Sequence, residues 1–243
     1  MEGCFISSAL NGATGDFYSM GNEWSGDMKN ELPKNYVPAL RFSWLTKIYD
    51  PVVKLTTRES LFKKRLVAKS ELQSGMRVLD IACGSGTLAL LIKQHYPDVE
   101  VIGIDGDRNI LEIAKSKSDK ARVQFNQGFA TDLPYADEHF DRVFSTLFFH
   151  HLCDKDKKVV FSEAYRVLSI DGVLYIADWG KPNSLIMRFT FYIVQFLDGF
   201  KNTRANVEGR LPKLIQGAGF SHVEVSESID TVLGTISIIC AKK

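Results

Sequence analysis

The sequence predicts a Rossmann-like α/β fold, in which helices cover both faces of a doubly wound, largely parallel sheet. From residue 76 onward, short segments rich in β-branched residues alternate with longer segments of helical pattern. This alternation is typical of parallel sheets whose strands are joined by crossover helices. A glycine-rich turn follows the first expected strand and begins the first expected helix. Open α/β sheets commonly bind their ligands at this position.

Strands and helices follow one another in a regular order along the chain. Strands are expected over residues 76–82, 99–105, 122–128, 140–146 and 172–178, with helices over 86–95, 108–118 and 155–168. Right-handed crossovers should join the parallel strands. A helical insertion over residues 183–217 separates the fifth strand from two final strands, near 221–227 and 231–241.

The chain is expected to consist of a short leader and one domain. Residues 1–30 are rich in Gly, Asn, Ser and Asp without a periodic pattern, which predicts a flexible leader. The single domain should contain an N-terminal helical cap (31–74), a core (75–180), a helical lid insertion (181–217) and the final strands (218–243). The basic run Lys63-Lys64-Arg65 is expected to lie on a solvated helix face.

Composition and charge narrow the class of protein. The 243 residues are 45% hydrophobic, and 30 basic residues balance 29 acidic ones. The net charge of +1 gives no electrostatic reason to expect nucleic-acid binding. The scattered cysteines favour a reducing cytoplasm over a disulfide framework. The most apolar long segment, 185–197, is interrupted by Arg188 and Gln195 and is too short to span a bilayer, although peripheral membrane contact stays open.

The sharpest motif is the glycine-rich turn in residues 78–89 (VLDIACGSGTLA). Glycine permits a tight turn and lets a ligand approach the backbone, and the start of a helix offers unpaired N–H groups. Asp105 ends the next strand, 21 residues after Gly84, where a carboxylate can accept both hydroxyls of a ribose. A plain tight turn would need neither the helix nor this acid, so we favour a nucleotide-type ligand.

The loop alone leaves two cofactors open. The segment from Gly84 to Ala89 satisfies the dinucleotide pattern G-x-G-x-x-G/A, which suits NAD, and it equally suits S-adenosylmethionine. No Gly-Lys-Ser/Thr follows the glycines, which excludes a P-loop. The segments around the loop distinguish the two cofactors.

Four segments, in the same order, resemble those of class I S-adenosylmethionine-dependent methyltransferases. Asp80-x-Ala82-x-Gly84-x-Gly86 resembles their motif I, and residues 128–135 (GFATDLPY) resemble the segment after their third strand. Residues 140–152 are similar to their fourth strand and its loop, and residues 163–174 to the helix and turn before their fifth strand. The subgroup resembled is methyltransferase type 11, which includes ubiquinone and menaquinone C-methylating enzymes.

This resemblance implies a fold, a cofactor and a set of contacts. The implied sheet has seven strands in the order 3-2-1-4-5-7-6, with strand 7 antiparallel, and the implied cofactor is S-adenosylmethionine. The family commonly has an acidic residue where this chain has Phe129. The implied cofactor contacts are Asp80, Gly84, Ser85 and Gly86 at the methionine part, Asp105 and Gly106 at the ribose, Phe129 and Ala130 at the adenine, Ser145 and Thr146 beneath the sulfonium, and Tyr49 as a lid.

Candidate catalytic residues follow the fourth and fifth strands. His150 and His151 come just after the fourth strand, and histidine is the natural base near neutral pH. Asp178 ends the fifth strand at the same edge of the sheet. The alternative is that the histidines cap a helix or pack beside the cofactor, and that Asp178 is a structural acceptor. A zinc site at His150, His151 and Cys153 is not expected, because adjacent histidines project differently and no further ligand is evident.

The acceptor is expected to be a small, apolar or aromatic molecule, lipid-like ones included. Two aromatic-rich segments outside the core pattern, 36–49 and 189–200, are expected to cover the site. The expected activity is transfer of a methyl group to oxygen or carbon by in-line displacement. An NAD-dependent oxidoreductase and a non-catalytic cofactor-binding protein are the alternatives, and a monomer and a homodimer are both open.

Overall fold

The computed structural model describes residues 57–118 and 121–243. The predicted leader, most of the predicted cap, Tyr49 and the aromatic segment 36–49 therefore lie outside the described residues. The described helices are α2 (Glu59–Ala68), α3 (Thr87–His95), α4 (Arg108–Ser118), α5 (Asp154–Val167), α6 (Leu185–Asp198), α7 (Phe200–Val207) and α8 (Leu211–Gln216), with a 3₁₀ turn η1 (Phe149–His151). No helix among them combines the length and the apolar character needed to cross a bilayer.

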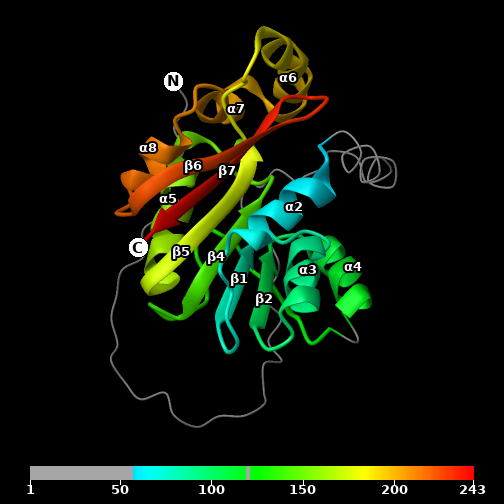
Figure 1. Ribbon diagram of the computed structural model, residues 1–243, viewed down its shortest axis with the longest axis vertical. Coiled ribbons are helices and arrows are strands. Elements are labelled where there is room, and N and C mark those ends of the chain that lie inside the picture. Colours follow the sequence, from blue (N-terminus) through cyan, green and yellow to red (C-terminus); the bar gives the residue numbers. More distant parts are fainter. Residues whose placement is uncertain (1–56, 119–120) are drawn as a thin grey trace, which may run out of the picture. The chain divides into compact units, whose positions relative to one another are not determined.

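Seven strands form one mixed sheet, as the resemblance implies (Figure 1). Its order is β3-β2-β1-β4-β5-β7-β6. The first five strands run parallel, and β7 is antiparallel to both β5 and β6. This confirms the predicted fold class. The strands are β1 (Arg77–Ile81), β2 (Glu100–Asp105), β3 (Gln124–Gln127), β4 (Phe140–Thr146), β5 (Leu168–Trp179), β6 (Ser221–Asp230) and β7 (Thr235–Lys242).

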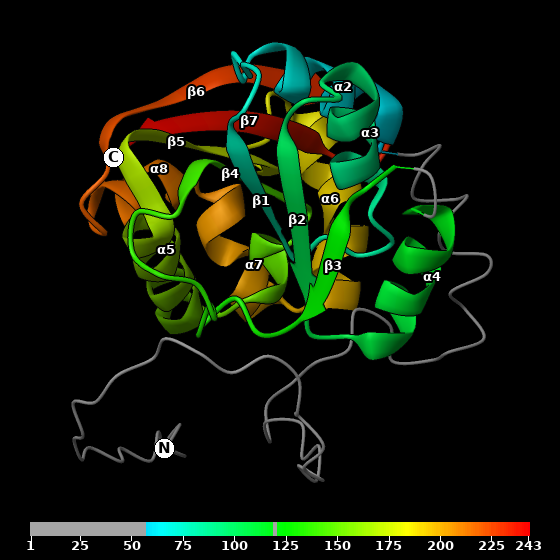
Figure 2. The same ribbon diagram turned by 90° about the horizontal axis from the view of Figure 1, so that it is seen from below.

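Helices cover both faces of the sheet (Figure 1, Figure 2). The helices α2, α3 and α4 pack on one face, and α5 and α8 pack on the other. Hydrophobic burial on both faces explains why the central strands carry nearly continuous apolar residues. The first cluster includes Phe62, Leu88, Leu111, Val78 and Phe144, and the second includes Phe161, Ile215, Leu79, Val143 and Ile176.

The prediction for the last strand begins four residues too early. Residues 231–234 form the turn between β6 and β7, where the N–H and the hydroxyl of Thr231 both donate to the carbonyl oxygen of Gly234, at 2.8 and 2.7 Å. A hydroxyl that bonds the local backbone competes with strand pairing and favours a turn. The β-branched residues of this segment therefore led to the wrong prediction that the strand begins at residue 231.

The prediction of a solvated face over Lys63 to Arg65 is wrong for Lys63. The Lys63 side chain is buried between α2 and α3, while its two basic neighbours are exposed. Its ammonium group donates to Glu59 Oε1 at 2.5 Å and to the hydroxyl of Thr87, the first residue of α3. A buried ammonium needs such partners because burial without them is costly. Lys63 thus holds α2 beside the start of α3.

Candidate active site

The turn after β1 contains two glycines with left-handed backbone conformations and different roles. Gly84 has φ 53° and Gly86 has φ 74°. A Cβ atom at Gly86 would lie 2.5 Å from the Phe125 ring, so this glycine lets the turn pack against β3. A Cβ atom at Gly84 would meet no heavy atom of the described residues within 4 Å. Open space therefore lies beside Gly84, where the sequence predicts a cofactor contact.

Asp105, at the end of β2, is bonded to the glycine turn. Its carboxylate accepts the N–H of Gly84 at 2.8 Å and the N–H of Asp107 at 2.9 Å. Burial raises the pKa of Asp105, and these two N–H donors oppose the rise. A carboxylate has about four acceptor positions. The two bonded N–H groups do not fill these positions, and the ribose contact of Asp105 stays a prediction.

Two buried polar side chains near the ends of β1 and β4 lack a partner in the described part of the chain. They are the carboxylate of Asp80 and the hydroxyl of Ser145. Burial raises the pKa of Asp80 to about 7, although the nearby Lys63 ammonium opposes the rise. Buried polar atoms are normally hydrogen-bonded, so such atoms at a ligand-binding edge call for an external partner. The donor and acceptor set fits a polar cofactor.

The remaining predicted cofactor residues cluster at the same edge of the sheet. The N–H of Gly128 donates to the carbonyl oxygen of Asp105 at 3.0 Å, and this bond holds the loop after β3 beside the end of β2. Phe129 and Ala130 follow in that loop, and Thr146 ends β4. The half-buried positions at this edge are Ser85, Gly106, Phe129, Ala130 and Thr146. Their contacts with a cofactor stay predictions.

Asp178 is a buried carboxylate with a dense set of donors. Its Oδ2 accepts the N–H of Phe148 at 3.0 Å and that of Phe149 at 2.6 Å, and its Oδ1 accepts the N–H of Trp179 at 2.7 Å. Burial opposes ionisation, but the neighbouring His150 and these donors outweigh it and hold the pKa of Asp178 below its usual value. Asp178 is therefore a fixed anion at the end of β5.

His150 takes its orientation from this anion. Its Nδ1 lies 2.7 Å from Asp178 Oδ1, and because an ionised carboxylate only accepts, Nδ1 must donate. The lone pair of the neutral ring then lies on Nε2. Burial lowers the pKa of His150, but the charge of Asp178 outweighs it, so that the net shift is upward. The pair has the arrangement of an oriented general base.

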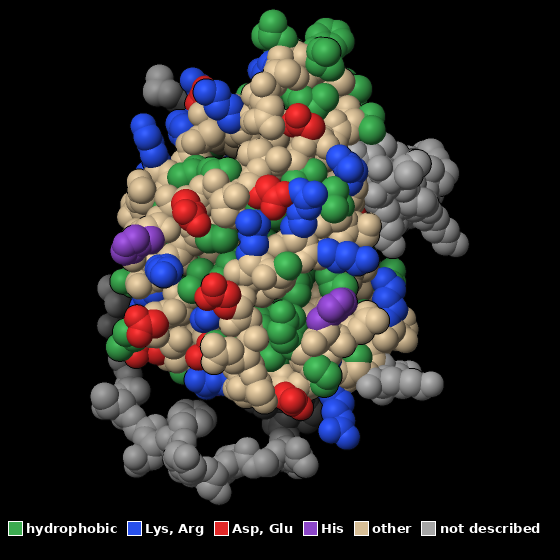
Figure 3. Space-filling model, in the orientation of Figure 1, with side chains coloured by type: hydrophobic (Ala, Val, Ile, Leu, Met, Phe, Trp, Pro, Cys, Tyr) green, Lys and Arg blue, Asp and Glu red, His purple; other side chains and the backbone are tan. Residues whose placement is uncertain are grey.

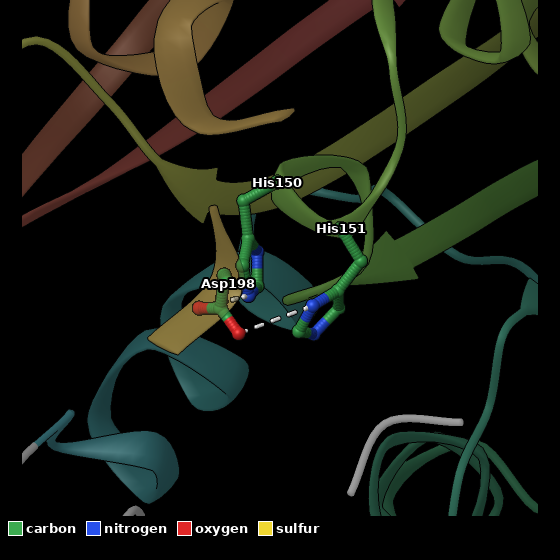
Figure 4. Close-up of side chains that lie close together, drawn as sticks. All are labelled: His150, His151 and Asp198. Carbon is green, nitrogen blue, oxygen red and sulfur yellow. Dashed lines mark ion pairs between the residues drawn. The ribbon is translucent and has the colours of Figure 1, made fainter. Parts of the chain in front are cut away.

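Asp198 completes this cluster, and the sequence analysis missed it. It is the last residue of α6, and its carboxylate lies 3.8 Å from His150 Nε2 and 3.4 Å from His151 Nδ1 (Figure 4). Burial opposes its ionisation, yet the two histidines hold the pKa of Asp198 below its usual value. The sequence contains one indication that Asp198 is special, because it is the only acidic residue in residues 172–207 other than Asp178.

The expectation that the two adjacent histidines project differently is wrong. The ring centroids of His150 and His151 lie 3.9 Å apart, because the η1 turn places both side chains on the carboxylate of Asp198. Burial and the neighbouring His150 lower the pKa of His151. The ligand atoms of the two histidines and Asp198 lie within 4.8 Å of one another, a spacing that could hold a divalent cation. Cys153 instead donates to Asp156 Oδ2 at 3.2 Å.

The aromatic side chains of residues 189–200 divide between core and surface. Phe191 is buried and its ring lies 5.3 Å from that of Trp179, between centroids. Phe189, Phe196 and Phe200 are exposed among the described residues. The cover that the sequence predicts over the site stays a prediction.

The chain matches known proteins over most of its length. A family of sequences described as a methyltransferase domain matches residues 78–172. A demethylmenaquinone methyltransferase of Lactobacillus johnsonii is 28% identical over 240 residues, which cover 89% of this chain and 97% of the relative. A demethylmenaquinone methyltransferase of Symbiobacterium thermophilum is 31% identical over 170 residues, covering 67% of this chain and 66% of the relative.

Solved structures share the fold. The crystal structure of an S-adenosylmethionine-dependent methyltransferase from Aquifex aeolicus superposes with a TM-score of 0.60 at 20% identity. The superposition covers 82% of this chain and 97% of that protein. The sheet order, the glycine turn with its acid, and the matched sequences agree with one another. The chain belongs to the class I S-adenosylmethionine-dependent methyltransferases, and S-adenosylmethionine is its cofactor.

Proposed function

We propose that the protein methylates a small, apolar aromatic acceptor that carries a hydroxyl group, of the reduced-quinone class. The observation that carries this proposal is the His150–Asp178 pair, a buried base at the edge of the sheet that holds the glycine turn. An aromatic hydroxyl must lose its proton before oxygen or a ring carbon becomes a good nucleophile. The demethylmenaquinone methyltransferases that this chain resembles support an acceptor of quinone type.

The residues around the glycine turn bind the cofactor in this proposal. When bound, S-adenosylmethionine supplies the methyl group on a sulfonium that is already a good leaving group. Asp105 accepts the ribose hydroxyls, and the open space at Gly84 admits the ligand close to the backbone. The unpartnered Asp80 carboxylate suits an ammonium group, and the unpartnered Ser145 hydroxyl suits a polar atom of either substrate. These residues align the reactants, which is the larger part of catalysis for such a reaction.

His150 removes the acceptor's proton in this proposal. Its Nε2 receives the proton of the acceptor hydroxyl, while Nδ1 keeps its hydrogen bond to Asp178. The imidazolium that forms is stabilised by the carboxylate of Asp178 and by that of Asp198, 3.8 Å from Nε2. The charge left on the acceptor is shared between its oxygen and the adjacent ring carbon. Methylation at oxygen needs no further proton transfer, whereas after methylation at carbon the hydrogen of that carbon leaves as a proton and the oxygen regains one. The orientation of the ring in the site therefore decides between O- and C-methylation.

Product analysis tests the proposal. The full chain is incubated with methyl-labelled S-adenosylmethionine and a reduced naphthoquinone that lacks the ring methyl group, under anaerobic conditions. We expect a labelled product, and NMR of that product locates the methyl group on carbon or oxygen. The dimethyl ether of the same naphthohydroquinone, in which both hydroxyl groups are methylated, serves as the matched control and should give no product. A protein that binds the cofactor but labels no hydroxylated aromatic compound would contradict the proposal.

A further inference from the structure

The helix α6 is apolar on two sides but packs against the protein on only one. Its 14 residues, LIMRFTFYIVQFLD, contain one basic and one acidic side chain. Phe191 and Val194 face the protein and are buried. A helix that is apolar all round normally lies inside a core or against lipid. The second apolar side of α6 therefore needs an explanation.

This second side of α6 is an exposed patch of apolar side chains. At about 100° per residue, its side chains occupy about 140° of the helix circumference. With Phe200 at the start of α7, eight of the twelve exposed large hydrophobic residues in the described part of the chain lie here. Figure 3 shows hydrophobic side chains at the surface of the top of the molecule, where Figure 1 places α6. The patch consists of Leu185, Ile186, Phe189, Tyr192, Ile193, Phe196, Leu197 and Phe200.

Basic side chains accompany the patch. Residues 181–204 contain Lys181, Arg188, Lys201 and Arg204, against the single acid Asp198, and Arg204 is paired with Glu208 at 2.8 Å. Asp198 lies against the two histidines of the active site. The segment is therefore locally basic in a chain whose net charge is only +1. Two copies that met through this patch would bring like charges together, whereas an anionic lipid surface would complement them.

Arg188 lies at the margin of the patch, in a position that would suit contact with lipid headgroups. Its guanidinium carbon is 4.3 Å from the centroid of the Tyr192 ring. Tyrosine and arginine together provide an apolar body with polar ends, and such side chains are favoured at the boundary between lipid tails and headgroups. An amphipathic helix lying in the plane of that boundary has the same combination of aromatic and basic residues.

We propose that the exposed side of α6 docks on an anionic lipid surface, with its apolar side chains inserted at the headgroup boundary. The docked helix ends at Asp198, which contacts the active-site histidines. A lipid-like acceptor could then reach the base without crossing bulk water. The docking proposal rests on α6 and the residues that flank it, and only the statement about the acceptor rests on the proposed function.

Vesicle sedimentation with the full chain tests docking in the absence of acceptor and cofactor. Vesicles of phosphatidylcholine with phosphatidylglycerol are compared with pure phosphatidylcholine. We expect binding to the anionic vesicles, weakened by salt. The double substitution Phe189→Ser and Phe196→Ser should reduce partitioning by at least about tenfold, because two aromatic side chains leave the bilayer. Ile170→Ser with Val232→Ser is the matched control, since both residues are exposed and apolar but lie outside the patch.

The outcomes separate docking from other uses of the patch. Circular dichroism and thermal unfolding verify that both double variants fold. Docking is overturned if the full chain does not bind anionic vesicles, or if the Phe189/Phe196 variant binds as well as the control. It is also overturned if light scattering finds a dimer that this variant alone dissociates, since a second copy would then cover the patch. Because no acceptor is present, a failed methylation assay does not affect this result.

Discussion

His150 and Asp178 form a buried pair, with Nδ1 of the histidine 2.7 Å from Oδ1 of the aspartate. The two residues come from different elements, the η1 turn after β4 and the end of β5. Parallel pairing of β4 with β5 places these two ends side by side, with Thr146 opposite Ala177. The pair is therefore a direct product of the strand order, and it directs Nε2 of His150 away from Asp178.

The pH dependence of activity tests this pair. In the wild type, the charge of Asp178 raises the pKa of His150, and only the neutral ring accepts a proton. The rate should therefore rise with pH through a midpoint above the usual histidine value. Asp178→Asn removes the charge, so the midpoint should move to lower pH, and the plateau rate should fall by about 10²–10⁴. A kcat profile at saturating cofactor measures both. An unchanged midpoint would argue against the pairing.

Asp198→Asn should have a milder effect. The asparagine can still accept a hydrogen bond from His151 but no longer stabilises the charged form of either histidine. We expect the kcat midpoint to move to lower pH with a plateau change of less than about tenfold, because Asp178 still orients His150. Asp98→Asn, at an exposed position, is the control. A purely structural Asp198 would change the unfolding temperature and leave the pH midpoint in place.

The two glycines of the turn should respond differently to alanine. In Gly86→Ala, the new Cβ atom would lie 2.5 Å from the Phe125 ring at a positive φ, so the free energy of unfolding should fall by about 1–3 kcal/mol or more. Gly84→Ala has only the backbone cost, about 1 kcal/mol, but fills the space open to the cofactor. Denaturant unfolding and cofactor titration should separate the two. Equal losses of stability would refute the distinction.

Asp105 should contribute to cofactor affinity. Asp105→Ala removes the acceptor for the ribose hydroxyls, and we expect affinity for S-adenosylmethionine to fall by about tenfold to a hundredfold. Asp105→Asn is the companion variant, because its one carbonyl oxygen can still accept either the Gly84 or the Asp107 N–H, while its NH2 group cannot accept the other. Isothermal calorimetry gives both dissociation constants. If Asp105→Ala folds and binds the cofactor like the wild type, the assigned contact is wrong.

The sequence predicted the core of the fold better than its connections. The helix at Arg108–Ser118 and the strand at Phe140–Thr146 match their predicted bounds, since periodicity and burial agree there. The position of β7 between β5 and β6 came from the family resemblance, because pairing across the chain leaves no local pattern. The pattern misled at residues 231–234 because Thr231 and Val232 favour strands, whereas the hydrogen bonds of Thr231 to Gly234 form a turn.

The candidate site was only partly accessible from sequence. His150 and Asp178 were each placed at one sheet edge by the order of strands, which is a topological argument. Asp198 could not be placed in this way, since its approach to both histidines depends on the packing of α6 on α7 and of α7 on η1 and β5. Lys63 was misjudged for the same reason, because only the packing of α2 on α3 buries it. Tertiary contacts of charged side chains carry no periodic signal.

The most direct measurement is the rate of methyl transfer in a His150→Gln variant at saturating cofactor. With a reduced naphthoquinone as acceptor, we predict a loss of about 10²–10⁴ in kcat and an unchanged affinity for S-adenosylmethionine, because glutamine cannot take the proton. His95→Gln, at an exposed position on α3, should behave like the wild type. If His150→Gln transfers the methyl group at the wild-type rate across neutral pH, His150 is not the base.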